Sequence, residues 1–467
     1  MTQNSPDLVT MEFIEDFAKI VGRQNVLVGE DVSQRSDTWV PTRAMEAACI
    51  VRPATTEEVA AIAVYCDRNG LALVPQGGRT GLAGGACTKA GDVALSLERM
   101  TAISPVDQAG LTMEVEAGAP LQAVQEAATA AGFLYPVDLG ARGSATIGGT
   151  IATNAGGNSV FRYGMTRDQV LGLEVVLADG TVLNSMNRLI KNNAAYDLKH
   201  MFVGSEGTLG IITRAILRLR PMPGDKATAF IGVSSFDAVL DLLALANSNA
   251  DGALSSFEVM WPSFLNIVMG GGHHRPPLEG EHAFYVLAEI ASHRASELMD
   301  HVVGLAWERG LVEDAAIAQN VAQASSFWAI RDDIDALLGG MKSVHLYDIS
   351  LPQRDMANYV EDLDAALRRS WSNASLAVFG HVADGNLHVA ICPGEEGHHP
   401  TIDAMVYSPL EALRGSISAE HGIGLEKLPY LRHSRSDAEI AVMSRLKALL
   451  DPRSTLNPGK VIPDAAS

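Results

Sequence analysis

From about residue 48 onward, the apolar and polar positions of the chain switch repeatedly between helical and strand spacing. The segment 50–70 predicts a strand, a turn and a helix, with Thr55 or Thr56 as the helix N-cap and Gly70 as its C-terminal stop. The same spacing rules predict strands at 71–76, 92–97 and 112–118, a helix at 120–132 and a hairpin at 171–183 turning at Asp179-Gly180.

The pattern changes after residue 222. Glycine-rich loops stop, and helices at 235–248 and 295–310 alternate with strands at 282–290 and 375–382. We therefore expect an α+β protein in three parts. These are a first domain over 1–222, a second α+β domain over 223–405 that contains an antiparallel hairpin, and a mostly helical segment over 406–467.

Composition and charge narrow the possible partners. Hydrophobic residues make up 47% of the 467 positions and charged residues 19%, which is typical of a globular enzyme. The net charge of −20 argues against nucleic acid and anionic membranes as partners. Four cysteines without a pairing pattern predict reduced core thiols. No apolar run is long enough for a membrane span, and the N-terminal residues lack targeting features, so we expect a cytoplasmic protein.

Two glycine-rich segments are the first candidates for chemistry. One follows the strand at 71–76 and covers residues 75–85; the other covers residues 144–157. Consecutive glycines allow a backbone to approach a phosphate or a planar ring closely and to point its amides at an anion. The first loop matches neither of the common phosphate-loop patterns. By themselves, the two segments could also be unrelated tight turns.

A second candidate is the segment 375–391. Asp384-Gly385 is a strong two-residue hairpin signal, and with that turn His381 pairs with His388 across the strands. Two imidazoles on one face, with Cβ atoms ~5 Å apart, suit a shared metal ion. A pair of solvated histidines on a sheet surface is the alternative.

Four sequence blocks together resemble a known family. They are PQGGRTGLAGG at 75–85, SATIGGTIATNAGG at 144–157, YDLKHMFVGSEGTLGIIT at 196–213 and LNPGK at 456–460. In this order and spacing they resemble the vanillyl-alcohol-oxidase/p-cresol-methylhydroxylase (PCMH) superfamily. Within it, the chain is similar to the branch of glycolate oxidase, D-lactate dehydrogenase and D-2-hydroxyglutarate dehydrogenase.

The resemblance implies the identity of each part. The first part would be a PCMH-type FAD-binding domain with two subdomains, the second a substrate (cap) domain, and the C-terminal segment would pack back on the first. Residues expected at FAD are Pro75, Gln76, Gly77, Gly78, Arg79, Thr80, Gly81, Leu82, Pro136, Asp138, Ser144, Thr146, Ile147, Gly148, Gly149, Asn154, Gly156, Glu206, Gly207, Ile211 and Asn457. A helix-capping role is the alternative for Glu206. Some relatives bind flavin covalently through a His where this chain has Thr80, so the resemblance implies non-covalent FAD.

The resemblance also implies a metal-assisted site. The block at 417–427 resembles the SGEHGIGxxK motif of the same branch and would supply Glu420 as a third ligand beside His381 and His388. The metal would be divalent, with Zn²⁺ expected, and His421 would be the general base. Arg331, in a WxxR-like motif, would bind the substrate carboxylate, and Asn386 would hydrogen-bond the substrate; a surface salt bridge is the alternative for Arg331.

The implied reaction is oxidation of a small D-2-hydroxy acid by hydride transfer to flavin. Two departures favour a lactate- or glycolate-like substrate over 2-hydroxyglutarate, because Leu346 and Asp335 stand where diacid-oxidising relatives have Lys and Thr. Lys342 is a substitute cation only if its loop rearranges. D-2-hydroxyglutarate dehydrogenase and a flavin-binding subunit of a glycolate oxidase complex stay open as alternatives, as does a zinc hydrolase without flavin. No NAD fingerprint is present, so we expect electrons to pass to a flavoprotein, a quinone or a cytochrome. A homodimer is an open expectation.

Overall fold

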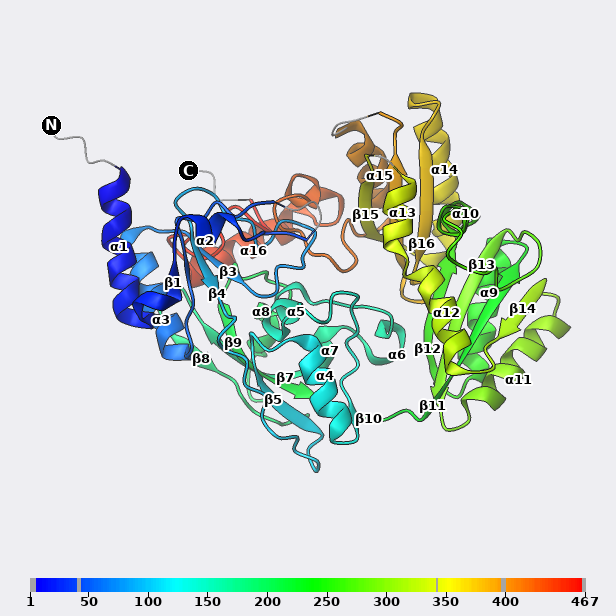
Figure 1. Ribbon diagram of the computed structural model, residues 1–467, viewed down its shortest axis with the longest axis horizontal. Coiled ribbons are helices and arrows are strands. Elements are labelled where there is room, and N and C mark those ends of the chain that lie inside the picture. Colours follow the sequence, from blue (N-terminus) through cyan, green and yellow to red (C-terminus); the bar gives the residue numbers. More distant parts are fainter. Residues whose placement is uncertain (1–5, 40–42, 342, 396–399, 464–467) are drawn as a thin grey trace.

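The computed structural model describes residues 6–39, 43–341, 343–395 and 400–463. It confirms the predicted α+β architecture: an N-terminal domain, a cap domain, and a C-terminal segment that returns to the N-terminal domain (Figure 1). Across the described ranges, no helix combines the length and apolarity needed to cross a membrane. All four cysteines are buried thiols, as predicted.

The first half of the N-terminal domain is built around a four-stranded sheet in the order β1-β2-β4-β3. Strands β2, β4 and β3 are parallel, and α3 forms the crossover between β2 and β3. The predicted caps of α3 are confirmed, since the Thr55 side chain accepts from the Glu58 amide and Gly70 is left-handed with φ 64°. The elements are α1 (Pro6–Val21), η1 (Arg23–Asn25), β1 (Val26–Leu27), α2 (Glu30–Ser33), β2 (Cys49–Val51), α3 (Thr56–Asn69), β3 (Leu73–Gln76) and β4 (Val93–Ser96).

The second half of this domain is an antiparallel four-stranded sheet in the order β5-β9-β7-β8. It shares one hydrophobic core with the first sheet, so the two subdomains form one body. The elements are β5 (Thr112–Glu116), α4 (Leu121–Ala130), β6 (Phe133–Leu134), α5 (Ile147–Thr153), α6 (Val160–Tyr163), α7 (Thr166–Gln169), β7 (Val170–Val176), β8 (Val182–Asn184), α8 (Lys199–Phe202), β9 (Ile211–Arg218) and β10 (Arg220–Pro221).

The cap domain is an antiparallel seven-stranded sheet in the order β14-β11-β13-β12-β16-β17-β15. Its outer face packs on α9, α11, α14 and α15, and its inner face packs on α10, α12 and α13. The strands are β11 (Asp225–Val233), β12 (Leu254–Met260), β13 (Phe284–Ser292), β14 (Asp314–Ile317), β15 (His345–Ser350), β16 (Ser375–Gly380) and β17 (Asn386–Cys392). The helices are α9 (Phe236–Asn249), α10 (Pro262–Gly270), α11 (Ala295–Glu308), α12 (Val321–Arg331), α13 (Ile334–Gly340), η2 (Gln353–Asp355), α14 (Met356–Ser370), η3 (Val382–Asp384) and α15 (Pro400–Leu413).

The C-terminal segment carries η4 (Leu428–His433) and α16 (Asp437–Leu450). Figure 1 shows α16 beside the blue strands of the N-terminal domain, and Leu456 forms a parallel bridge with Leu73 of β3. The expected boundary at 405/406 falls inside α15. Ile402, Val406 and Leu410 of that helix all pack in the cap core, so the cap domain extends past residue 405.

Candidate active site

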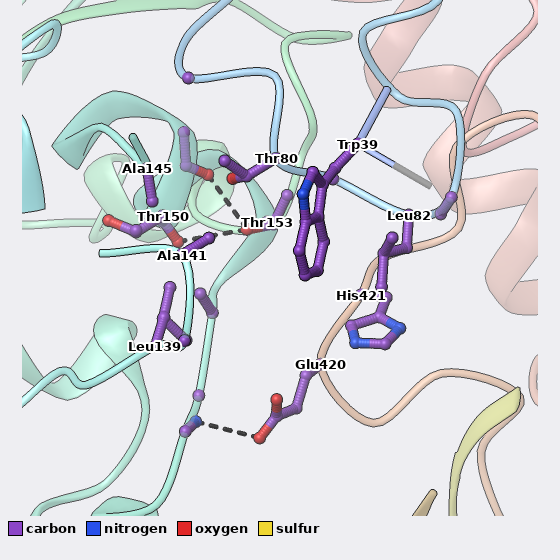
Figure 2. Close-up of a pocket in the computed structure, with 18 of the residues that line it drawn as sticks. Trp39, Thr80, Leu82, Leu139, Ala141, Ala145, Thr150, Thr153, Glu420 and His421 are labelled. Atoms are coloured by element: carbon purple, nitrogen blue, oxygen red, sulfur yellow. Dashed lines mark hydrogen bonds between the residues drawn. The ribbon is translucent and has the colours of Figure 1, made fainter. Parts of the chain in front are cut away.

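A cavity of about 850 Å³ lies where the N-terminal domain, the inner face of the cap sheet and the loop 418–424 meet. This size is typical of a pocket for a large organic ligand. Figure 2 shows Leu82 and His421 facing Leu139 and Ala141 across the pocket, with the indole of Trp39 projecting into it.

The two glycine-rich segments line one side of the cavity and lie against each other. A Cβ at Gly77 would lie 2.3 Å from Thr146 Oγ1, and one at Gly78 would lie 1.9 Å from the Ser144 carbonyl oxygen. A Cβ at Gly81 would have no neighbour within 4 Å. Gly77 and Gly78 therefore allow one loop to approach the other, and the paired loops together form the cavity wall. This arrangement of the two loops suits the binding of an extended ligand that has a phosphorylated part and a planar part.

Most of the residues expected at FAD line this cavity. They are Pro75, Gln76, Gly77, Gly78, Arg79, Thr80, Gly81, Leu82, Asp138, Thr146, Gly148, Gly149, Gly156, Glu206, Gly207 and Ile211. Five others are not among the lining residues: Pro136, Ser144, Ile147, Asn154 and Asn457.

Two of these five, Asn154 and Asn457, make hydrogen bonds to neighbouring backbone groups. Asn154 is the left-handed C-cap of α5, and its side chain accepts from the Arg167 amide at 2.9 Å. The Asn457 amide donates to the carbonyls of Gly85 and Glu206 at 2.9 and 2.8 Å and ties the C-terminal segment to the loops. Neither asparagine lines the cavity, and both side chains hydrogen-bond backbone groups of neighbouring segments.

Glu206 has a second role that the sequence did not predict. Its carboxylate accepts from the amides of Ile423 and Gly424 at 2.7 and 3.0 Å, so it holds the loop 418–424 onto the N-terminal domain. Burial raises the pKa of Glu206 and outweighs these two amide hydrogen bonds.

The hairpin that carries the two candidate histidines has a longer loop than predicted. Phe379, not His381, pairs with His388 across the two strands. The backbone N–H of Asn386 donates to the His381 carbonyl at 3.2 Å. The loop has four residues, 382–385, and closes on the left-handed Gly385. The strand pairing is shifted by two residues relative to the predicted register. Because side chains alternate between the two faces of a sheet, a shift of two leaves each side chain on the predicted face. The rings of His381 and His388 still meet, with centroids 5.2 Å apart.

A buried carboxylate, Glu258, connects Arg331 with His381. Its Oε2 accepts from Arg331 Nε at 2.9 Å and lies 2.8 Å from Nη2, and its Oε1 lies 2.7 Å from His381 Nδ1. Arg331 is buried and lines the cavity, so the surface salt bridge considered for it is wrong. Burial alone would lower the pKa of His381, but the Glu258 carboxylate outweighs it and raises that pKa to about 9.

A second buried carboxylate, Asp348, lies beneath the loop 418–424. Its Oδ2 accepts from three successive amides, those of Ala419, Glu420 and His421, at 3.1, 2.8 and 3.1 Å. Its Oδ1 accepts from the Asn386 side chain at 2.8 Å. Asn386 therefore lies behind the cavity wall and contacts Asp348; it is not among the residues that line the cavity, where the sequence analysis expected it.

The three expected metal ligands line the same cavity but do not form a closed ligand set. His381 Nε2 lies 3.8 Å from Glu420 Oε1, and the same carboxylate oxygen accepts from the Gly157 amide at 3.0 Å. Within the part of the chain that the structure describes, no group of three or more His, Cys, Asp or Glu side chains is arranged to hold a metal ion. The donor types are those of a catalytic zinc site, and each would have to shift to bind one ion.

Leu346, Leu337 and Phe379 contribute apolar side chains to the cavity lining, and the exposed Asp335 contributes a negative charge. Leu346 lies two residues before Asp348 on β15, which places both side chains on the inner face of the sheet. Lys342, the substitute cation considered above, lies outside the described residues.

Sequence reasoning missed Glu258 and the role of Asp348. Glu258 lies in β12, whose residues are all buried, Asp348 lies in the buried middle of β15, and both side chains are essentially inaccessible to solvent. An acid inside a buried strand is costly unless it is paired, so the pattern SSFEVM was an available signal. Trp39 had no such signal, because only the folded chain brings residue 39 to the cavity.

Comparison with known proteins agrees with this architecture. Residues 47–185 match the family model of an FAD binding domain, and residues 222–461 match that of the C-terminal domain of FAD linked oxidases. The chain is 37% identical over 457 residues to a mitochondrial D-2-hydroxyglutarate dehydrogenase of Arabidopsis thaliana, covering 96% of this chain and 81% of the relative. It is 38% identical over 444 residues to a D-2-hydroxyglutarate dehydrogenase of Xanthomonas citri pv. viticola, covering 93% and 91%.

A solved structure of p-cresol methylhydroxylase with substrate bound superimposes with a TM-score of 0.77 at 15% identity, covering 99% of both chains. At that identity the likeness shows the fold alone. The predicted PCMH-type fold and the FAD-binding domain are thus confirmed. The chain belongs to the family of FAD-linked oxidoreductases that includes these D-2-hydroxyglutarate dehydrogenases.

Proposed function

We propose that this chain oxidises a D-2-hydroxy acid to the corresponding 2-oxo acid. The observation that carries the proposal is the meeting of three sets of residues at one cavity. The glycine-rich loops provide the wall for FAD, Arg331 provides a cation for a carboxylate, and His421 provides a base. A hydrolase without flavin would leave the paired glycine-rich loops without a role.

In this proposal the chain's residues bind and deprotonate the substrate. Arg331 attracts the carboxylate. Its Nε and Nη2 lie against Glu258 and its Nη1 donates to Asp332 Oδ1 at 3.1 Å, so the substrate carboxylate would compete with the exposed Asp332 for Nη1. His421 takes the hydroxyl proton as the C=O bond forms. FAD held by the glycine-rich loops would supply the oxidising power as the acceptor of the hydride from the substrate Cα.

We also propose a divalent cation, with Zn²⁺ first, at His381, His388 and Glu420. The support is the chemistry of the donors and their common place at the cavity. Such an ion would stabilise negative charge on the substrate hydroxyl oxygen. Because a metal ligand must be an unprotonated imidazole, binding would require His381 to lose the proton that Glu258 favours.

The metal proposal predicts that His381→Ala, His388→Ala and Glu420→Ala each lose the ion and keep FAD. Elemental analysis and a flavin spectrum of each purified variant measure both. His301→Ala, at a histidine on α11 outside the cavity, is the matched control and should retain the ion. Full metal occupancy in all three site variants would rule out this ligand set.

Two substrate classes have support. A small, uncharged side chain, as in lactate or glycolate, is favoured by Leu346 and Asp335 at the cavity. The diacid 2-hydroxyglutarate is favoured by the names of the relatives with 35–39% identity. We place the small monoacid first, because Leu346 offers a second carboxylate no hydrogen bond and the negative charge of Asp335 would repel it.

The deciding experiment is anaerobic reduction of the bound flavin. D-lactate, glycolate, D-2-hydroxybutyrate and D-2-hydroxyglutarate, with the available L-enantiomers, are mixed with the oxidised protein and bleaching is followed. The proposal expects bleaching by D-enantiomers and by glycolate. Bleaching by none of these acids would refute the proposed reaction, and faster bleaching by the diacid would favour the second substrate class. An electron-transfer flavoprotein, a quinone or a cytochrome is the proposed acceptor.

A further inference from the structure

The loop 418–424 carries Glu420 and His421 and is held from both domains. Glu206 of the N-terminal domain accepts from the amides of Ile423 and Gly424, and Asp348 of the cap sheet accepts from the amides of residues 419–421. Five of the loop's backbone N–H groups thus end on two buried carboxylates. The position of His421 is therefore determined by these carboxylates more than by contacts of its own ring.

Asp348 also faces the ring of His421. The closest approach is from Oδ2 to Nδ1, at 3.8 Å. Because Nδ1 and Nε2 lie on opposite sides of an imidazole, a carboxylate at Nδ1 favours the tautomer with hydrogen on Nδ1 and leaves the lone pair on Nε2. The His421 side chain is 31% exposed and lines the cavity, so Nε2 is the nitrogen available to a substrate.

The Asp348 side chain is inaccessible to solvent and has several polar neighbours. Its Oδ1 accepts from the Asn386 side chain, its Oδ2 accepts from the three loop amides, and Lys427 Nζ lies 3.9 Å from Oδ2. These contacts hold the buried carboxylate in one orientation beside the His421 ring.

We propose that Asp348 is the positioning residue of His421. It fixes the loop backbone through Oδ2 and orients the ring so that Nε2 receives the substrate hydroxyl proton, in the way that a buried carboxylate orients the histidine of a hydrolytic triad. The inference rests on the proposed function, since it takes His421 as the base. Asp348 contacts neither substrate nor flavin in this scheme and acts through the loop and the ring.

The test is a double-mutant cycle with Asp348→Asn, His421→Ala and the combined variant, measured as anaerobic flavin reduction by the substrate that bleaches the wild type. His421→Ala should slow reduction about 10²–10⁴-fold, the usual contribution of a positioned base. Asp348→Asn should slow it about 10- to 10³-fold, with the dissociation constant of the substrate within about threefold of wild type. In the His421→Ala background, the same change should have less than about a threefold effect, because the residue it positions is gone.

A matched control uses another buried carboxylate of the cap domain. Asp403 accepts from the hydroxyls of Tyr347 and Tyr430 at 2.6 and 2.7 Å and does not line the cavity. Asp403→Asn should lower the unfolding temperature and leave flavin reduction within about threefold of wild type. If Asp348→Asn does not retain FAD, the cycle is run with Asp348→Glu, which keeps the charge and moves it by one methylene.

Several results would overturn the proposal. If the rate reductions caused by Asp348→Asn and His421→Ala multiply in the combined variant, Asp348 does not act through His421. A defect of Asp348→Asn that added Zn²⁺ restores would assign its effect to His388, whose Nδ1 lies 3.6 Å from Oδ1. A His421→Ala variant that reduces flavin at the wild-type rate would refute the proposed base, and a wild type bleached by no hydroxy acid would refute the proposed function.

Discussion

At the scale of single residues, the site is organised by buried acids. Glu258 forms hydrogen bonds with Arg331 and His381, and Asp348 accepts hydrogen bonds from the backbone of the loop that bears His421. Arg331, His381 and His421 line the cavity and provide its functional groups. A buried carboxylate behind each of them fixes its orientation and influences its charge. The histidines and Arg331 were predictable from motif resemblance. An acid within a buried strand indicates that some partner exists, but the partners of Glu258 and Asp348 were not predictable, because they come from other strands and from a loop more than 70 residues away.

Glu258→Gln should destabilise the protein by about 3–5 kcal/mol, because it leaves the buried Arg331 with only the half-exposed Asp332 as its counter-charge. Burial would raise the pKa of Glu258, but His381 and Arg331 hold it down at about 2, so the carboxylate is charged at neutral pH. Urea unfolding at pH 7 measures the loss. Glu297→Gln, which removes an exposed ion pair with Arg294, is the control and should change stability little. Equal unfolding midpoints for the two variants would contradict this account of Glu258.

Leu346→Lys should convert the substrate preference toward a diacid. A charge-assisted hydrogen bond contributes about 1.5–3 kcal/mol, so kcat/KM for D-2-hydroxyglutarate should rise about 10- to 150-fold, while that for D-lactate changes little. Leu346 is 43% exposed, so the longer side chain can be accommodated. Leu346→Gln is the control, since it adds polarity without charge. A wild type that already prefers the diacid, with no gain in the Lys variant, would mean that other residues bind the distal group.

At the scale of elements, the strand and helix pattern was predicted well where local signals were strong. The caps of α3, the glycine-rich loop after β3 and the hairpin β7–β8 all follow from residues close together in sequence. The β16–β17 loop was predicted two residues too short, because Asp384-Gly385 also suits the end of a four-residue loop. The boundary after residue 405 failed for a different reason: α15 is held by a cap core that the sequence alone does not display.

The loop 418–424 offers a prediction at this scale. Gly422 is left-handed with φ 81°, and a Cβ there would lie 2.6 Å from Glu206 Oε1. Gly422→Ala should cost about 1–2 kcal/mol for the backbone conformation and more for displacing Glu206. Gly252→Ala is matched, since Gly252 has φ 70° and open space around the added carbon. Thermal unfolding and amide hydrogen exchange of residues 419–424 should show the larger effect in Gly422→Ala. Equal effects in both variants would remove Glu206 as the clamp of this loop.

At the scale of the whole molecule, the cavity belongs to neither domain alone. Its wall uses the loops after β3 and before α5, the inner face of the cap sheet, and the loop 418–424. Lys447 of α16 donates to the carbonyls of Thr208 and Leu456, which anchors that segment to the N-terminal domain. A ligand that fills the cavity therefore bridges the domains, and its binding free energy contributes to the stability of the whole protein.

Two consequences follow for FAD. Thr80 has no nucleophile for a flavin bond, so acid denaturation should leave the yellow colour in the supernatant after centrifugation, and colour in the pellet would refute non-covalent binding.

The apoprotein should unfold at a lower temperature than the holoprotein, because a ligand at 100 times its Kd adds about 2.7 kcal/mol to stability. Adding FAD to the apoprotein should restore the higher unfolding temperature, and adding riboflavin at the same concentration is the control. Riboflavin lacks the pyrophosphate that the paired glycine-rich loops are expected to hold, so a full recovery with riboflavin would show that these loops do not bind that group.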